Sequence, residues 1–181
     1  TEHRHSDPRW LDALETQLAA AAVCIAASRL NLLSPLAHYV AQLGEGRTLF
    51  PLPYISLSGW TESEIQRQPA LAVEEALKER FKQSRGLDAH SGKSHEGAQR
   101  SDFLVRYAAK DMPADQCSTG EQKGLLLAIV LAHALMMRGE KGFVPVLLLD
   151  EVAAHLDDAR RDELFTILSS LDGQVFLTGT D

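Results

Sequence analysis

Two adjacent acids, Asp150 and Glu151, follow a run of four apolar residues from Val146 to Leu149. A run of this length without polar alternation is typical of a β-strand covered on both faces, which predicts a central strand in a sheet. The two carboxylates would then lie at its carboxyl end, where open α/β sheets bind ligands. This pattern indicates a Walker B site, in which Asp150 would hold Mg²⁺, mostly through water, and Glu151 would polarise the attacking water as general base. The plainer alternative is that both acids cap the next element.

A second candidate site is the segment Ser118-Thr119-Gly120-Glu121-Gln122, which has the S-x-x-E form of a capping box and predicts the start of a helix. The same geometry directs free backbone N–H groups and the positive end of the helix dipole at any anion in front of it. Gly120 would let a phosphate approach closely. Taken alone the segment is an ordinary helix cap, but followed by Asp150 and Glu151 it indicates a site for the γ-phosphate of a nucleotide.

A Gly-Lys-Ser triplet at residues 92–94 is the ending of a Walker A phosphate loop. The first glycine of that motif would have to stand where the chain has Leu87, and no buried strand leads into the segment. We therefore interpret the triplet as solvated loop, and we expect the chain to have no phosphate loop of its own.

The elements predicted after Cys117 alternate between helix and strand. They are a helix at 119–138, a strand at 145–150, a helix at 158–171 and a strand at 174–178. This order predicts an α/β fold with a parallel sheet. Residues 117–181 would form one subdomain that carries both candidate motifs.

Residues 1–47 are predicted to form a long helix, which begins at Asp7 and Pro8 because these residue types favour a helix start. Apolar side chains recur every seven residues at Leu11, Leu18, Ile25, Leu32 and Tyr39. This seam favours a coiled-coil-like arm whose partner helix lies outside the chain, the alternative being a helix packed on its own domain. Pro35 predicts a kink.

Residues 48–116 are predicted to form a second lobe. It would contain a short strand around 54–58, an amphipathic helix at 71–81 and a strand at 103–107. Residues 84–101, rich in Gly, Ser, His and Lys, are predicted to form an exposed, mobile loop.

Composition leaves several function classes open and disfavours others. The chain has 181 residues, a net charge of −7 and two cysteines, so neither a disulfide framework nor a broad DNA-coating surface is expected. The amino terminus has no signal-peptide pattern and we expect no membrane span. These features predict a cytoplasmic protein and leave a local basic groove possible.

The order of the motifs resembles the ABC-type ATPases, in which an S-x-G-x-Q signature helix precedes a Walker B strand ending in Asp-Glu. Residues 152–157 are similar to the D-loop that crosses to the opposing subunit in the family's dimers, with Asp157 as the matching acid. The segment that ends the chain lies where the family's switch senses the γ-phosphate. Thr178 or Thr180 stands there in place of the usual histidine.

Within this superfamily the chain resembles the RecF family. The similarity is carried by the runs Cys117-Ser-Thr-Gly-Glu-Gln-Lys-Gly-Leu-Leu-Leu-Ala, Leu147-Leu-Leu-Asp-Glu-Val-Ala-Ala-His-Leu-Asp and Leu177-Thr-Gly-Thr-Asp. It is close over 101–181 and weaker before residue 100, and Gly97-Ala98-Gln99-Arg100 departs from the family's usual Gly-Pro-His-Arg. The resemblance implies the carboxyl-terminal half of an ABC-type ATPase head, with a helical arm and second lobe, and with Walker A earlier in the complete protein.

The resemblance also implies a function. It predicts an ATP- and Mg²⁺-dependent DNA-binding protein of recombinational repair that forms a homodimer on ATP and acts at gapped DNA. It would help other recombination mediator proteins to load the recombinase, while a fragment without Walker A would not hydrolyse ATP. Two alternatives are the head of another SMC-like chromosome ATPase, with a far longer arm, and a non-enzymatic interaction module derived from such a head.

Overall fold

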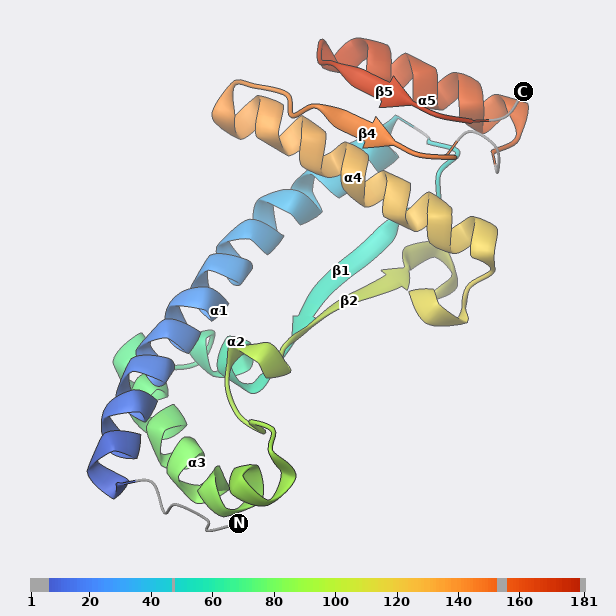
Figure 1. Ribbon diagram of the computed structural model, residues 1–181. Coiled ribbons are helices and arrows are strands. Elements are labelled where there is room, and N and C mark those ends of the chain that lie inside the picture. Colours follow the sequence, from blue (N-terminus) through green and yellow to red (C-terminus); the bar gives the residue numbers. More distant parts are fainter. Residues whose placement is uncertain (1–6, 47, 153–155, 180–181) are drawn as a thin grey trace. The chain divides into compact units, whose positions relative to one another are not determined.

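The computed structural model describes residues 7–46, 48–152 and 156–179, which form a mixed α/β fold (Figure 1). The chain divides into two compact units. Unit 1 comprises Thr1–Leu32 and Leu57–Phe103, and unit 2 comprises Leu33–Ser56 and Leu104–Asp181. This division differs from the predicted segments 1–47, 48–116 and 117–181, because the long first helix and the first two strands each contribute residues to both units.

Unit 1 is built from helices. It contains the first part of α1 (Pro8–Glu45), α2 (Trp60–Ile65), α3 (Ala70–Ser91) and the short helix η1 (Ala98–Arg100). Asp7 caps α1, since its Oδ1 accepts a hydrogen bond of 2.9 Å from the Arg9 N–H. The core joins residues from three of these helices: Ala19, Ala22, Leu77, Phe81 and Ala98, with Trp60 against them.

Within unit 1, α1 packs through a different face from the predicted seam. The buried residues of this part of the helix are small, namely Ala19, Ala22, Val23 and Ala26, which allows close packing. The seam residues Leu18, Ile25 and Leu32 are 53%, 43% and 49% exposed. The helix thus packs on its own unit and also presents an apolar stripe. Helix α1 continues through Pro35 to Glu45. The kink at Pro35 and the partner helix for the stripe both stay predictions.

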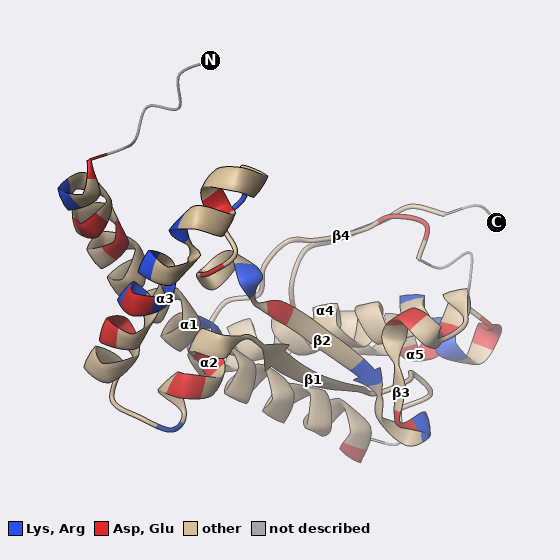
Figure 2. Cartoon of the chain, turned by 90° about the horizontal axis from the view of Figure 1, so that it is seen from below, with Lys and Arg blue, Asp and Glu red and all other residues tan. Residues whose placement is uncertain are grey.

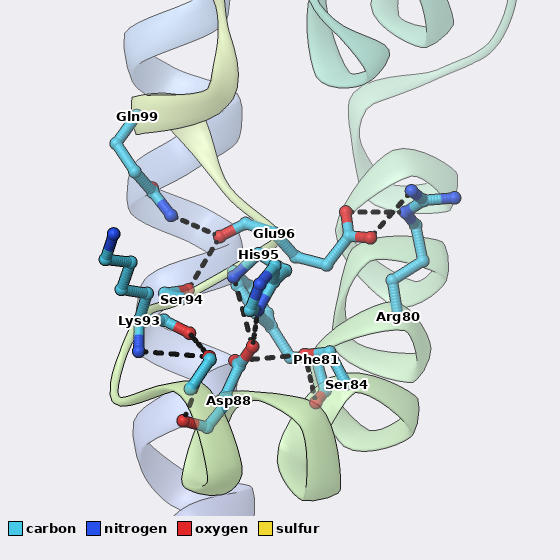
Figure 3. A network of polar contacts seen from close by, with 10 residues as sticks. Arg80, Phe81, Ser84, Asp88, Lys93, Ser94, His95, Glu96 and Gln99 are labelled. Atoms are coloured by element: carbon cyan, nitrogen blue, oxygen red, sulfur yellow. Dashed lines mark hydrogen bonds and ion pairs between the residues drawn. The ribbon is translucent and has the colours of Figure 1, made fainter.

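The prediction of a loop over residues 84–101 is wrong in its first half, because α3 continues to Ser91. These residues are polar but form helix readily, and Arg85 anchors them to α1 through ion pairs of 2.5 Å with both Asp12 and Glu15. The segment that follows folds back onto α3 (Figure 3). There Asp88 Oδ1 accepts the His95 backbone N–H at 3.1 Å, and Arg80 forms two hydrogen bonds of 2.9 and 2.8 Å with Glu96.

The Gly-Lys-Ser triplet lies at the carboxyl end of α3. Gly92 is the helix cap, with φ of +67°, and its N–H donates to the Asp88 carbonyl oxygen. A phosphate loop requires the opposite end of a helix, where free N–H groups point outward. This position agrees with the interpretation that the triplet is not a Walker A motif.

Two small sheets complete the fold. The first has the order β1 (Pro53–Ser58), β2 (Asp102–Tyr107) and β3 (Met112–Pro113), with β2 and β3 antiparallel. The second pairs β4 (Leu147–Leu149) in parallel with β5 (Val175–Leu177), and Leu147 is opposite Val175. The predicted parallel pairing of these two strands is therefore confirmed.

The core of unit 2 is centred on α4 (Thr119–Lys141), which follows the short helices η2 (Ala108–Lys110) and η3 (Ala114–Gln116). One face of α4 packs with β4 and with α5 (Asp158–Leu171). The buried residues of this cluster include Leu127, Leu131, Leu147, Leu149, Leu164 and Leu168. A second cluster joins α4 to the end of α1 and to β1: Leu36, Val40, Ile55, Ala132 and Met136. Helix α4 therefore holds β4 in place.

The prediction that β4 is central and covered on both faces is wrong for this chain. Leu147 and Leu149 are 7% and 6% exposed, whereas Leu148 between them is 75% exposed. Phe176 on the paired strand is 53% exposed, and among the described residues β4 pairs only with β5. An apolar run indicates that both faces become buried, but it does not say that the same chain supplies both covers.

By length and composition alone, α1 and α4 could each cross a membrane. The core helix of a soluble protein meets the same test, and one face of α4 is buried in the core of unit 2. In α1, Glu15 and Arg29 form ion pairs with partners on α3 and α2. Both helices therefore make contacts with other elements of their units.

Candidate functional site

The site centres on three residues at the carboxyl ends of the paired strands. Asp150 directly follows β4 and Thr178 directly follows β5, so the parallel register brings them together. The Thr178 hydroxyl donates a hydrogen bond to Asp150 Oδ1 and accepts one of 3.1 Å from the backbone N–H of Glu151. Asp150 and Glu151 are both exposed. The two acids are thus accessible at a strand end.

A cavity of about 320 Å³ opens beside these acids. Its lining is mostly apolar and comes from α4, β4 and the segment after β4, including Leu126, Val130 and Leu148. Three charged residues, Lys123, Asp150 and Glu151, also line it. The wall of the cavity thus combines exposed leucines with one basic and two acidic side chains, so it can contact both apolar and charged groups.

Ser118 begins α4 as the capping box predicts. Its side chain accepts the Glu121 N–H at 3.4 Å, and the Glu121 carboxylate accepts the Ser118 N–H at 2.9 Å. Ser118, Thr119 and Gly120 are all exposed. The tip of α4 is therefore ordered by its own side chains and open to contact.

Lys110 offsets the negative charge of Glu121 in this cap. It forms an ion pair with Glu121, and this hydrogen bond, with those from the Ser118 N–H and hydroxyl, lowers the pKa of Glu121 from 4.5 to about 2. The same pair raises the pKa of Lys110. Glu121 therefore stays ionised at any pH at which the protein would work, with its negative charge offset by Lys110.

The Gln122 side chain forms a hydrogen bond at this tip, whereas Gly120 leaves space beside it. The Gln122 side-chain amide donates to the Cys117 carbonyl oxygen at 3.0 Å, so it holds the loop before the helix. At Gly120 an added Cβ would meet no atom of the described residues within 4 Å. Packing within the described chain thus gives no reason for a glycine at position 120.

Asp157 caps α5, since its side chain accepts the Arg160 N–H at 2.9 Å. The side chain is 61% exposed. The rest of the predicted D-loop includes residues 153–155, which lie outside the described residues, as does Thr180. Any contact of Asp157 with a second subunit stays a prediction.

Sequence reasoning missed Lys110 and Lys123. Lys123 shares a helix face with Leu126, Leu127 and Val130, a spacing that could have assigned it to the same wall. Lys110 is separated from Glu121 by β3 and η3, so no helical or strand periodicity connects the two. The catalytic and binding roles of the predicted site residues stay predictions.

Comparison with known proteins identifies relatives along nearly the whole chain. The "DNA replication and repair protein RecF" of Mesorhizobium japonicum is 49% identical over 175 residues, and that of Rhizobium rhizogenes is 44% identical. The protein of this name from Brucella abortus is 44% identical over 177 residues. Each alignment covers 97% of this chain and 46% of the relative, so the chain spans about half their length. No protein-family model matches.

Solved structures agree with this relationship at the level of the fold. The structure of the recombination mediator protein RecF-ATPrS in the RecFOR pathway superposes with a TM-score of 0.77 at 21% identity, over 98% of this chain and 47% of that chain. The RecF-ATP structure gives a TM-score of 0.76 at 23% identity, over 99% and 47%. The α/β fold of this chain is therefore that of about half of the chain in these RecF structures.

Proposed function

We propose that this chain, homologous to RecF proteins over nearly its whole length, supplies one half of each nucleotide site in an ABC-type ATPase of DNA repair. The observation that carries the proposal is the pair Asp150 and Glu151, accessible at the carboxyl end of β4 and held by Thr178 from β5. Open α/β sheets bind ligands at such strand ends. The two solved structures with this fold are described as RecF-ATPrS and RecF-ATP, which supports a nucleotide at this site.

The acids divide the chemistry between them. Asp150 is an exposed carboxylate, the ligand type that Mg²⁺ prefers, and it would hold the Mg²⁺ that accompanies ATP. The metal would neutralise charge on the phosphates. Glu151 would accept a proton from the attacking water.

The tip of α4 would act on the nucleotide of a second subunit. Thr119 and Gly120 present backbone N–H groups at a helix start, where an anion is favoured, beside the exposed Ser118 that caps the helix. The open space around Gly120 supports this proposal, because a phosphate from outside would need the room that a side chain would fill. Glu121 and Gln122 would hold the tip of α4 in its conformation through their hydrogen bonds. Asp157 would contribute to the same nucleotide site from the opposing D-loop.

The complete protein would bind ATP, form a homodimer, and act on gapped DNA in the cytoplasm with other recombination mediator proteins. The names of the relatives, which refer to DNA replication and repair, and of the structures, which refer to the RecFOR pathway, support this. The chain itself has no Walker A motif in its sequence, so alone it should not hydrolyse ATP.

The experiment is Glu151→Gln in the full-length protein. Removing the general base should reduce ATP turnover about 10²- to 10⁴-fold while ATP binding persists and the ATP-bound dimer accumulates. Glu140→Gln, at an exposed acid near the far end of α4, is the matched control and should leave turnover unchanged. Unchanged turnover in Glu151→Gln would overturn the proposal.

A further inference from the structure

We propose that Thr178 is a positioning residue, whose single hydroxyl sets the geometry of both Asp150 and Glu151 instead of contacting the nucleotide. This inference rests on the function proposed above. It assigns to the switch position a task different from phosphate sensing. The observation behind it is that Thr178 forms hydrogen bonds with three consecutive residues: Leu149, which ends β4, and Asp150 and Glu151, which follow it.

Thr178 makes three hydrogen bonds across the strand ends. Its backbone N–H donates to the Leu149 carbonyl oxygen at 3.1 Å, which extends the β4–β5 ladder by one residue. Its hydroxyl donates to Asp150 Oδ1. The same hydroxyl oxygen accepts the Glu151 N–H at 3.1 Å. The chain from Leu149 to Glu151 is therefore fixed by one residue of the neighbouring strand.

The hydroxyl group matches this task in its hydrogen-bonding capacity. A threonine hydroxyl has one hydrogen to donate and two lone pairs to accept with. Asp150 offers only acceptors when ionised, and the Glu151 N–H only a donor, so one hydroxyl satisfies both. Its hydrogen is then engaged by Asp150. A phosphate oxygen would need that same hydrogen, which argues against direct phosphate sensing by Thr178.

The backbone of Glu151 explains why such a contact is needed. Glu151 has φ of +51°, a left-handed conformation that non-glycine residues adopt rarely. Such conformations persist where the surroundings fix them. The hydrogen bond from the Glu151 N–H to Thr178 is one such restraint, and it determines the direction in which the Glu151 side chain leaves the backbone.

The test compares Thr178→Val with Thr178→Ser in the full-length protein. Valine keeps the β-branched shape that suits a strand end but has no hydroxyl, whereas serine keeps the hydroxyl. Hydrogen exchange of the Glu151 amide, measured without nucleotide, should be at least about 10-fold faster in Thr178→Val and near wild type in Thr178→Ser. Unchanged Glu151 protection in Thr178→Val would overturn the inference.

Turnover provides the second measurement. Thr178→Val should lower kcat about 10- to 100-fold through misplacement of the two acids, with little change in the KM for ATP, and Thr178→Ser should restore kcat. Loss of ATP binding with kcat retained would instead indicate contact with the nucleotide and overturn the inference. If Thr178→Val fails to fold, Thr178→Ala replaces it in both assays.

The two measurements separate this inference from the proposed function. Wild-type protein that fails to hydrolyse ATP would contradict the function, while amide exchange at Glu151 would still report on the hydroxyl of Thr178. Normal turnover in wild type with unprotected Glu151 would contradict only the inference.

Discussion

The Thr178 hydroxyl donates a hydrogen bond to Asp150 from the neighbouring parallel strand. These residues are 28 positions apart in sequence, and the chain between them includes α5, after which β5 pairs in parallel with β4. The geometry of the two acids therefore depends on the pairing of β4 with β5 as well as on β4 itself. Changes in β5 should reach the site through this one side chain.

Two glycines one helical turn apart on α4 should respond in opposite ways to alanine. A Cβ on Gly120 would meet no atom of the described residues within 4 Å, whereas a Cβ on the buried Gly124 would lie 2.6 and 2.7 Å from the rigid ring of Pro51. Gly124→Ala should destabilise the fold by about 1–3 kcal/mol despite the better helix propensity of alanine. Gly120→Ala should not destabilise it, yet should weaken ATP-driven dimerisation in the full-length protein.

Urea unfolding and gel filtration with ATP check these two variants. Gly86→Ala on α3, where a Cβ also meets nothing within 4 Å, is the control for helix propensity alone and should stabilise by about 0.5–1 kcal/mol. Normal dimerisation of Gly120→Ala would count against a phosphate at the tip of α4.

The capping box should be sensitive to pH only in strong acid. The pKa of Glu121 is lowered from 4.5 to about 2, first by the hydrogen bond from Lys110, so its contribution to stability is complete above pH 4.5 and is lost as the pH falls toward 2. A carboxyl NMR titration should show Glu121 titrating near pH 2. In Lys110→Met the pKa of Glu121 should rise, while the bonds from Ser118 still keep it below 4.5.

Lys141→Met, at the opposite end of α4, is the matched charge control and should leave the pKa of Glu121 unchanged. A wild-type Glu121 that titrates at its ordinary pKa would refute the Lys110 contact.

Arg29 should stabilise unit 1 through a buried acid. Glu62 is 1% exposed, and its carboxylate is bound by Arg29 at 3.2 Å and by the Ser101 hydroxyl at 2.6 Å. Arg29→Met leaves a buried charge with one partner fewer and should cost about 2–3 kcal/mol. This is less than for a fully buried pair, because the Arg29 side chain is 38% exposed.

The control for Arg29 is Arg67→Met. Arg67 is 74% exposed and lies 3.6 Å from Glu64, so its loss should change the free energy of unfolding by less than about 0.5 kcal/mol. Equal effects of both substitutions in urea titrations would contradict the role given to Glu62.

The sequence predicts local structure well where one chemical cause decides it. Ser118 and Glu121 are three residues apart, so the capping box could be predicted from spacing alone. The sequence predicts a helix at 158–171 with the bounds that α5 has, and in the structure Asp157 caps it. The strands before and after this helix could be paired because alternating helix and strand predicts a parallel sheet.

Predictions from the sequence fail where tertiary contacts determine the local structure or the burial of a residue. The polar residues 84–91 were assigned to a loop, but contacts of Arg85 with α1 hold them as helix. Leu148 is as apolar as Leu147, but Leu147 is buried in the cluster that β4 forms with α4 and α5, whereas Leu148 is 75% exposed. The hydroxyl of Thr178 could not be assigned to Asp150 either, because residue spacing does not say which atoms of neighbouring strands meet.

The most direct test of the account mixes two inactive full-length variants, Ser118→Arg and Glu151→Gln, before ATP is added. Ser118→Ala, which removes only the helix cap, controls for the stability of α4. If each site joins the tip of α4 from one subunit to the acids of the other, mixed dimers retain one intact site. Random pairing should then restore about a quarter of wild-type ATP hydrolysis. A mixture as inactive as its components would contradict the shared site.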